Sequence, residues 1–252
     1  MTETLPVNTS ANDEGKPAAL WEDFVDVFTN PSAVFARRRD GAYAGGLTIL
    51  ASLSAIVFVA TRAFWQPFFD HQMQAAFAAQ QAAGKLTAEQ VEQARGAMEK
   101  FTGVMTWITG IVSTPVAVML VALLVMGAAH LVGAKLNYGQ SLVAATLAYV
   151  PRVLAFAFGA GILAVKDPTT LPLGAAPTSP AALLPATTSQ IAVGLLNRFD
   201  PFILWGTLLI GIGVAVLGRV ARAKGYQTAA MVWGFATLFA LLNALRTAAA
   251  AG

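Results

Sequence analysis

Long stretches with almost no charged residue constrain this chain more than any other feature. Stretches at about 42–65, 101–134, 141–165, 199–218 and 226–245 each provide the roughly 20 apolar residues that a helix needs to cross a bilayer. Only 12% of the chain is charged, against roughly 25% in a soluble protein. The sequence therefore predicts an all-α integral membrane protein, a bundle of five spanning helices.

Two longer segments between these stretches are expected outside the membrane. Residues 66–100 are rich in helix-forming Ala, Gln and Glu, are interrupted by Gly84, and restart at Thr87, which has capping-box spacing to Gln90. They predict a helical hairpin between spans one and two. Residues 166–198 form a Pro-rich outer loop, in which Ser189 caps a short apolar helix expected to lie on the membrane surface. Residues 1–19 lack apolar periodicity, which is typical of a disordered tail.

Residues 20–40 have the periodicity of amphipathic helices. Their large apolar residues recur at helical spacing and acids lie opposite: Leu20, Trp21, Phe24, Val27 and Phe28 against Glu22, Asp23 and Asp26. Asn30 and Pro31 restart the helix, and Arg37, Arg38 and Arg39 close it. Two interpretations stay open. The helices could lie at the lipid–water interface with the arginines at headgroups, or they could pack on the bundle.

The positions of Lys and Arg predict the orientation, because cytoplasmic loops are enriched in these residues. The arginines at 37–39, Lys135, and the basic group at 219–224 all fall on one side of a bundle of five spans. That side is expected to be cytoplasmic, together with the N-terminus, and the C-terminus is expected outside. The excess is modest, since other basic residues fall on the opposite side.

Arg152 stands near the middle of the third stretch, directly after Pro151. A charge inside a membrane indicates a functional site by default, so Arg152 is a candidate contact for an anion or lipid headgroup. Alternatively, its role is structural: Pro151 leaves the Leu147 carbonyl without a donor, and an arginine that faces the interior can bond such carbonyls or a partner. No other span has an acid in its core, although Asp200 or Asp40 could approach from the ends.

Other residues in the spans carry weaker signals. Pro115 and Pro151 are expected to break their helices. His130, near the cytoplasmic end of the second span, is expected to be a hydrogen-bonded structural group. Small residues are expected to let helices approach closely; they include Gly206, Gly211, Gly213 and Gly218.

Motifs of several enzyme classes are missing from the sequence. It has no Gly-x-Ser-x-Gly, no His-Glu-x-x-His, no Walker lysine loop and no acidic pair within a span. It has no cysteine for a thiolate metal site, and its two histidines do not make a metal site. The net charge of +3 is spread out, unlike that of a nucleic-acid-binding protein. We expect neither an enzyme, nor a cofactor, nor nucleic acid as a partner.

Three segments resemble the bacterial branch of the Ypt-interacting-protein (YIP) membrane domain family. They are FTNPSAVFARRR before the first span, LAYVPRVLAF in the third, and LNRFDPFILWGTLLIGIGVAVLGRVARAKGY around the fourth. The family features are Pro then Phe in the lead-in, an aromatic residue (here Tyr149) followed by Pro in the third span, and Asp-x-Phe-x-x-Trp, here beginning at Asp200. The resemblance assigns residues 41–250 to a YIP-like membrane domain that includes the hairpin as an insertion.

The resemblance implies a five-helix bundle in the bacterial inner membrane. Eukaryotic relatives bind Rab-class GTPases, but the Asp-Leu-x-Gly-Pro segment of some of them is missing here and the N-terminal arm is short, so GTPase binding is not carried over. We expect a non-enzymatic multi-pass protein that acts through membrane lipids, a membrane-protein partner or its own oligomer. The alternative is a small transporter or channel with an anion contact at Arg152.

Overall fold

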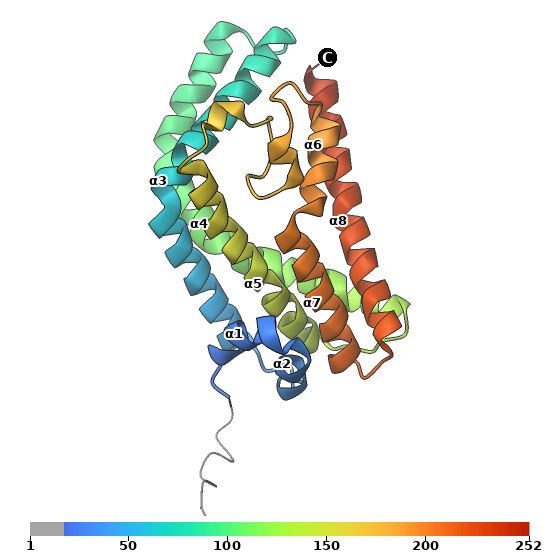
Figure 1. Cartoon of the computed structure of the whole chain (residues 1–252). Coiled ribbons are helices and arrows are strands. Elements are labelled where there is room, and N and C mark those ends of the chain that lie inside the picture. The colour runs from blue at the N-terminus through green and yellow to red at the C-terminus, as the bar shows by residue number, and fades with distance from the viewer. Residues whose placement is uncertain (1–17, 252) are drawn as a thin grey trace, which may run out of the picture.

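The described part of the chain is a bundle of helices (Figure 1). The computed structural model describes residues 18–251, apart from the side chains of 98–111 and 247–251. No strand occurs among these residues, which confirms the predicted all-α class. The helices are α1 (Glu22–Thr29), α2 (Pro31–Arg37), α3 (Ala44–Ala82), α4 (Ala88–Leu131), α5 (Tyr138–Leu163), α6 (Gln190–Leu196), α7 (Pro201–Leu217) and α8 (Arg222–Ala251), with 3-10 turns η1 (Pro168–Thr170), η2 (Pro180–Leu183) and η3 (Asn197–Phe199).

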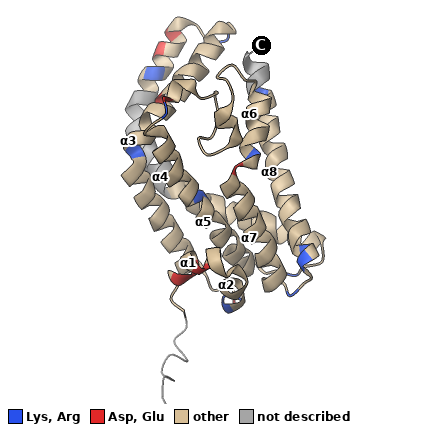
Figure 2. Cartoon of the chain, viewed as in Figure 1, with Lys and Arg blue, Asp and Glu red and all other residues tan. Residues whose placement is uncertain are grey.

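The structure has four described helices that are long and apolar enough to cross a membrane: α3, the Val112–Leu131 part of α4, α5 and the Arg222–Arg246 part of α8. A fifth candidate is a bent pair, in which Gln190–Phe199 and Pro201–Leu217 meet at 51°. Helix α7 alone has 17 residues, or about 25 Å of rise, which is just short of a hydrocarbon core of about 30 Å. Many charged residues lie toward the two ends of the bundle, and others lie between the ends, one of them on α5 (Figure 2).

Helix ends follow the local signals in the sequence. The Thr87 hydroxyl accepts from the Gln90 amide, and the Gln90 side chain accepts from the Thr87 amide, which completes the predicted capping box. Ser189 caps α6 as predicted. Gly84 has φ of +67°, a left-handed conformation that glycine adopts without strain, and it lies in the turn between α3 and α4. The predicted hairpin is thus a direct continuation of the two long helices.

The predicted helix breaks at Pro115 and Pro151 are wrong. Helix α4 continues through Pro115, and α5 continues through Pro151. Pro67 likewise lies inside α3. A proline removes one hydrogen bond from a helix, but neighbouring helices can hold the backbone in place. In α5 the support is direct, because Pro151 itself is buried.

Helix α5 packs against α3, α4 and α7, and α7 packs against α8. Small residues allow the closest approaches, as predicted. A side chain at Gly206 would place its Cβ 2.5 Å from the Ala148 carbonyl oxygen of α5. A side chain at Gly225 of α8 would collide with the Gly211 carbonyl of α7. These contacts hold the backbones of α5, α7 and α8 together.

The N-terminal helices differ from the expected amphipathic pattern at Asp23. Its side chain is 0% exposed and accepts bonds from Arg37 Nε at 2.7 Å, Arg38 Nε at 2.7 Å and the Tyr43 hydroxyl at 2.9 Å. Burial, together with the adjacent Asp23 charge, raises the pKa of the Tyr43 phenol, which keeps its proton. The prediction that Asp23 lies on the polar outer face was wrong, because three donors compensate its burial. Trp21, predicted on the apolar face, is 61% exposed.

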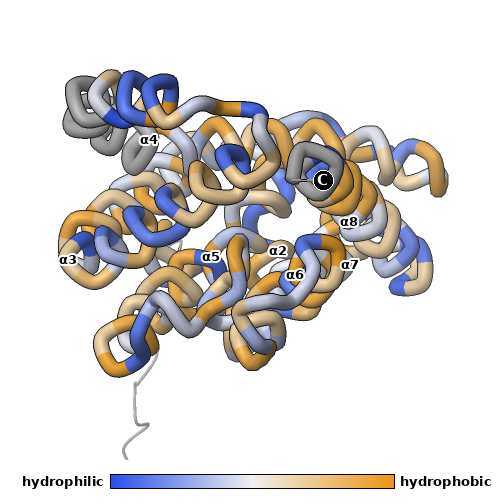
Figure 3. Tube along the Cα trace, turned by 90° about the horizontal axis from the view of Figure 1, so that it is seen from above, coloured by the Kyte–Doolittle hydropathy of each residue, from blue (hydrophilic) through white to orange (hydrophobic). Residues whose placement is uncertain are grey.

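Helices α1 and α2 pack on the bundle through α5 and α7, and Phe35 and Val34 are 0% exposed. This arrangement fits the interpretation in which they pack on the spanning helices. In the view along the bundle, the α3–α4 hairpin is more hydrophilic than the spanning segments below it (Figure 3). Helix α6 packs along α8, with Gly194 against Ala244, and its expected place on the membrane surface stays a prediction.

Candidate functional site

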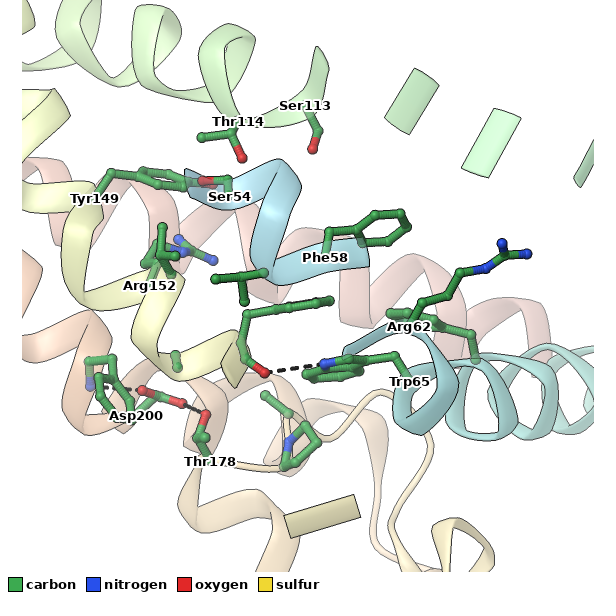
Figure 4. A pocket seen from close by; sticks show the side chains of 18 of the residues that line it. Ser54, Phe58, Arg62, Trp65, Ser113, Thr114, Tyr149, Arg152, Thr178 and Asp200 are labelled. Atoms are coloured by element: carbon green, nitrogen blue, oxygen red, sulfur yellow. Dashed lines mark hydrogen bonds between the residues drawn. The ribbon is translucent and has the colours of Figure 1, made fainter. Parts of the chain in front are cut away.

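A cavity of about 670 Å³ lies between α3, α5, the start of α7 and the outer loop (Figure 4). The outer loop forms one wall through residues 176–178. Its position is fixed by Gln72 of α3, whose side-chain oxygen accepts from Gly174 N at 2.6 Å. Asn197 adds a second support, since it donates to the Gly174 carbonyl and accepts from Ala176 N. The Pro-rich outer loop is thus held in place by hydrogen bonds and forms one wall of the cavity.

Aromatic side chains form much of the cavity wall. The rings of Trp65 and Phe156 stack with centroids 4.2 Å apart, and Phe69 stacks on the Trp65 ring at 5.4 Å. The Trp65 indole also donates to the Phe156 carbonyl at 3.2 Å. This wall joins α3 to α5 and offers an apolar surface to any molecule within the cavity.

Hydroxyl groups lie at one end of the cavity. Ser54, Thr114 and Tyr149 approach it from α3, α4 and α5 (Figure 4). Ser54 Oγ is buried and has no hydrogen-bond partner among the described residues. A buried polar atom without a partner is uncommon in a protein structure, so this end is suited to a ligand that can hydrogen-bond.

Arg152 enters the cavity from near the middle of α5 (Figure 4). Its side chain has no hydrogen bond or ion pair with any described residue. Its guanidinium carbon lies over the Tyr149 ring, 5.3 Å from the ring centroid. The bond from Arg152 to the Leu147 carbonyl, one form of the structural alternative, is therefore not observed. The guanidinium of Arg152 is solvent-accessible and can therefore contact an anion, as the candidate role requires.

Asp200 lies on the same cavity but does not pair with Arg152 in the described structure. It is 3% exposed. One carboxylate oxygen accepts from Phe202 N at 2.8 Å and caps α7, and the other accepts from the Thr178 hydroxyl. Asp200 therefore fixes the outer loop to the bend between η3 and α7, and its predicted place at the end of a span is also the edge of the cavity.

Arg198 is a second arginine of this region that the sequence analysis did not single out. It donates from Nε to the Thr237 hydroxyl at 3.1 Å and lies over the Trp233 ring. With Arg152 it lines a smaller cavity of about 100 Å³, which shares part of its wall with the larger one. The two guanidinium groups are close enough to repel each other.

The remaining candidates lie away from the cavity. His130 Nδ1 is 2.7 Å from the Met126 carbonyl one turn earlier in α4 and so donates to it. Arg37 and Arg38 are held by Asp23, and Arg39 donates to the Val216 carbonyl at 3.3 Å. The proposed headgroup contacts of these arginines stay a prediction. Pro115 follows Ser113 and Thr114, which line the cavity, but does not line it itself.

The chemistry of the site is that of a binding cavity. The described residues contain no group of three or more His, Cys, Asp or Glu side chains that could hold a metal ion. The cavity instead combines an aromatic wall, a cluster of hydroxyls and an unpaired guanidinium. An amphiphile with an anionic head presents the matching surface.

The fold defines a multi-pass helical membrane protein with a cavity among its spans. The chain matches the family model described as Yip1 domain over residues 25–244, nearly its whole length, and it belongs to that family. No curated protein and no solved structure matches it in the corresponding comparisons.

Proposed function

We propose that this Yip1-family protein is a non-enzymatic membrane protein that acts by holding a lipid in the cavity between α3 and α5. The observation that carries the proposal is the cavity of about 670 Å³ with its aromatic wall. That volume falls within the range of about 300–1,000 Å³ that is usual for small-molecule sites. The stacked rings suit a hydrocarbon chain, and the hydroxyls and Arg152 suit a polar head.

The test is to fill the cavity with a large side chain and to measure how much lipid the purified protein retains. Ala155 lines the cavity, whereas its neighbour Leu154 is exposed on the outside of α5 and does not line it. We expect native mass spectrometry of the wild type, purified in mild detergent, to show a retained lipid. Ala155→Trp should lose it and Leu154→Trp should keep it. Equal lipid retention by both variants, with equal melting temperatures, would refute the proposal.

The alternative function is a small transporter or channel with an anion contact at Arg152. It is favoured by the break between η3 and α7, because broken helices beside a binding site are typical of transporters. The continuity of α4 and α5 through their prolines removes part of its original basis. Measurement of anion flux in reconstituted vesicles distinguishes the two functions. A transporter or channel should give anion flux that Arg152→Gln abolishes, whereas a lipid-holding protein should give no flux above that of empty vesicles.

The location and partners of the protein belong to the same proposal. We place it in a bacterial inner membrane with the N-terminus in the cytoplasm and the C-terminus outside. Reporter fusions at both termini test this, and termini on the same side would contradict it. A membrane-protein partner or a second copy of the chain would be recovered by pull-down in mild detergent. Binding of a GTPase is not part of the proposal.

A further inference from the structure

Two positive charges without a counterion lie together inside the bundle. Arg152 of α5 and Arg198 of η3 both line the cavity of about 100 Å³, and no Asp or Glu of the described chain does. The described residues give neither arginine an ion pair. Charged side chains at membrane depth are costly and normally pair with an opposite charge. Here two like charges line the same cavity instead.

The nearby acids are already engaged. Asp200 and Asp70 line the larger cavity, not the smaller one. Both oxygens of Asp200 accept hydrogen bonds, from Phe202 N and Thr178, and Asp70 accepts from Gln66 at 2.9 Å. Neither acid forms an ion pair with Arg152 or Arg198, so among the described residues no carboxylate contacts either guanidinium group.

The size and donors of the small cavity indicate what could balance the two charges. About 100 Å³ is roughly three times the share of one water in the liquid, so the cavity takes a compact oxyanion and not a large headgroup. Guanidinium groups present planar, paired donors that match phosphate oxygens. The guanidinium carbon of Arg152 lies over the Tyr149 ring at 5.3 Å and that of Arg198 over the Trp233 ring at 5.9 Å, so that each arginine has an aromatic neighbour.

We propose that Arg152 and Arg198 together bind a phosphate group, that of a phospholipid whose chains occupy the larger cavity or that of a free phosphate ion. The two cavities share Tyr149, Arg152, Phe202 and Ile203 in their walls, so that a headgroup in the smaller one is continuous with chains in the larger. The inference rests on the proposed lipid-holding function only for the source of the phosphate.

Titration of the delipidated full-length protein in detergent tests the proposal with matched ligands. The probes are short-chain phosphatidic acid, the diacylglycerol with the same chains and no phosphate, and inorganic phosphate. We expect phosphatidic acid to bind at least about tenfold tighter than diacylglycerol. Arg152→Gln and Arg198→Gln should each weaken phosphatidic acid by about ten- to hundredfold and leave diacylglycerol unchanged.

Further variants separate binding from folding. Arg152→Lys keeps the charge but loses the fork, so it should fall between wild type and Arg152→Gln. Arg222→Gln, on an exposed arginine at the start of α8, should bind like the wild type. Because the described chain gives Arg152 a like charge and no counterion, ligand-free Arg152→Gln should melt no lower than ligand-free wild type.

The outcomes of the titration distinguish the proposed phosphate site from the proposed lipid-holding function. If inorganic phosphate binds as tightly as phosphatidic acid and displaces it, the phosphate site stands and the lipid-holding function fails. If phosphatidic acid and diacylglycerol bind equally, and neither arginine variant changes this, the phosphate site is overturned while the lipid-holding function stands. If none of the probes binds, both are overturned.

Discussion

Replacing Asp23 with Ala should release the N-terminal helices from the bundle. The carboxylate is 0% exposed and is shared by Arg37, Arg38 and Tyr43. Breaking a buried ion pair costs about 3–5 kcal/mol. We expect the lower end, about 3 kcal/mol, because Arg37 and Arg38 are 27% and 16% exposed and can turn to water. Asp26 is the matched control: it is 42% exposed and has one arginine contact, so Asp26→Ala should cost at most about 1 kcal/mol.

The assay uses the chain's natural lack of cysteine. A single Val34→Cys places a thiol at a position that is 0% exposed, and Ser32→Cys, at an exposed position of the same helix, gives the rate of an unprotected thiol. Maleimide labelling of the buried thiol then reports local opening. A cost of about 3 kcal/mol predicts labelling roughly 100-fold faster in Asp23→Ala. If Asp23→Ala and Asp26→Ala label the buried thiol at the same rate, the Asp23 cluster does not hold the helices in place.

Three further predictions concern the packing and ends of the long helices. Gly206→Leu must displace the Ala148 carbonyl and should destabilise the protein by about 1–3 kcal/mol in a detergent melt. The control Gly234→Ala, with open space around it, should be neutral or stabilise by up to about 1 kcal/mol. Equal melting temperatures would exclude a close contact between Gly206 and Ala148. Thr87→Ala should cost about 1 kcal/mol of local stability, seen as faster hydrogen exchange at the start of α4, and unchanged exchange would count against the capping box. Trp65→Ala should cost about 3–5 kcal/mol in the same detergent melt, because its ring stacks on Phe156 in the cavity wall; a melt equal to that of the wild type would count against this packing.

The features predicted correctly are those that depend on neighbouring residues in sequence. The capping box at Thr87, the cap at Ser189 and the turn at Gly84 are local. The close approaches at Gly206 and Gly211 follow from small residues, which leave room for a neighbouring backbone. The long apolar stretches required helices whatever their neighbours. None of these needs knowledge of the tertiary arrangement.

The errors arose where distant residues meet. A helical projection puts Asp23 opposite the apolar face, but it cannot show that Arg37 and Arg38, after a turn in the chain, fold back onto it. The prolines signal a lost hydrogen bond but not the packing that tolerates it. A sequence-level rule also treats a basic residue in a loop as an exposed charge.

Arg198 is the clearest example of this limit. It precedes a span and was counted as an outer charge, yet it bonds Thr237 and lies over Trp233 of α8. The available signal was that these two residues stand one helical turn apart on α8 and offer a hydroxyl and a ring to one partner. The cavity itself left no signal, because its shape depends on the angles at which α3, α5 and α7 cross.

Helix α3 connects the cavity to the tip of the hairpin as a single rod. It has 39 residues, or about 58 Å of rise, and it contributes Ser54 and Trp65 to the cavity before it reaches the turn at Gly84. Pro67 is the one residue within this rod that lacks a backbone donor, and it adjoins the stacked rings of the cavity wall. Because sharp helix kinks are almost always found at features such as proline, Pro67 makes the part of α3 beside Trp65 the place where the helix is expected to bend. A protein that binds the hairpin tip would therefore be able to move α3 about Pro67 and so change the shape of the cavity wall.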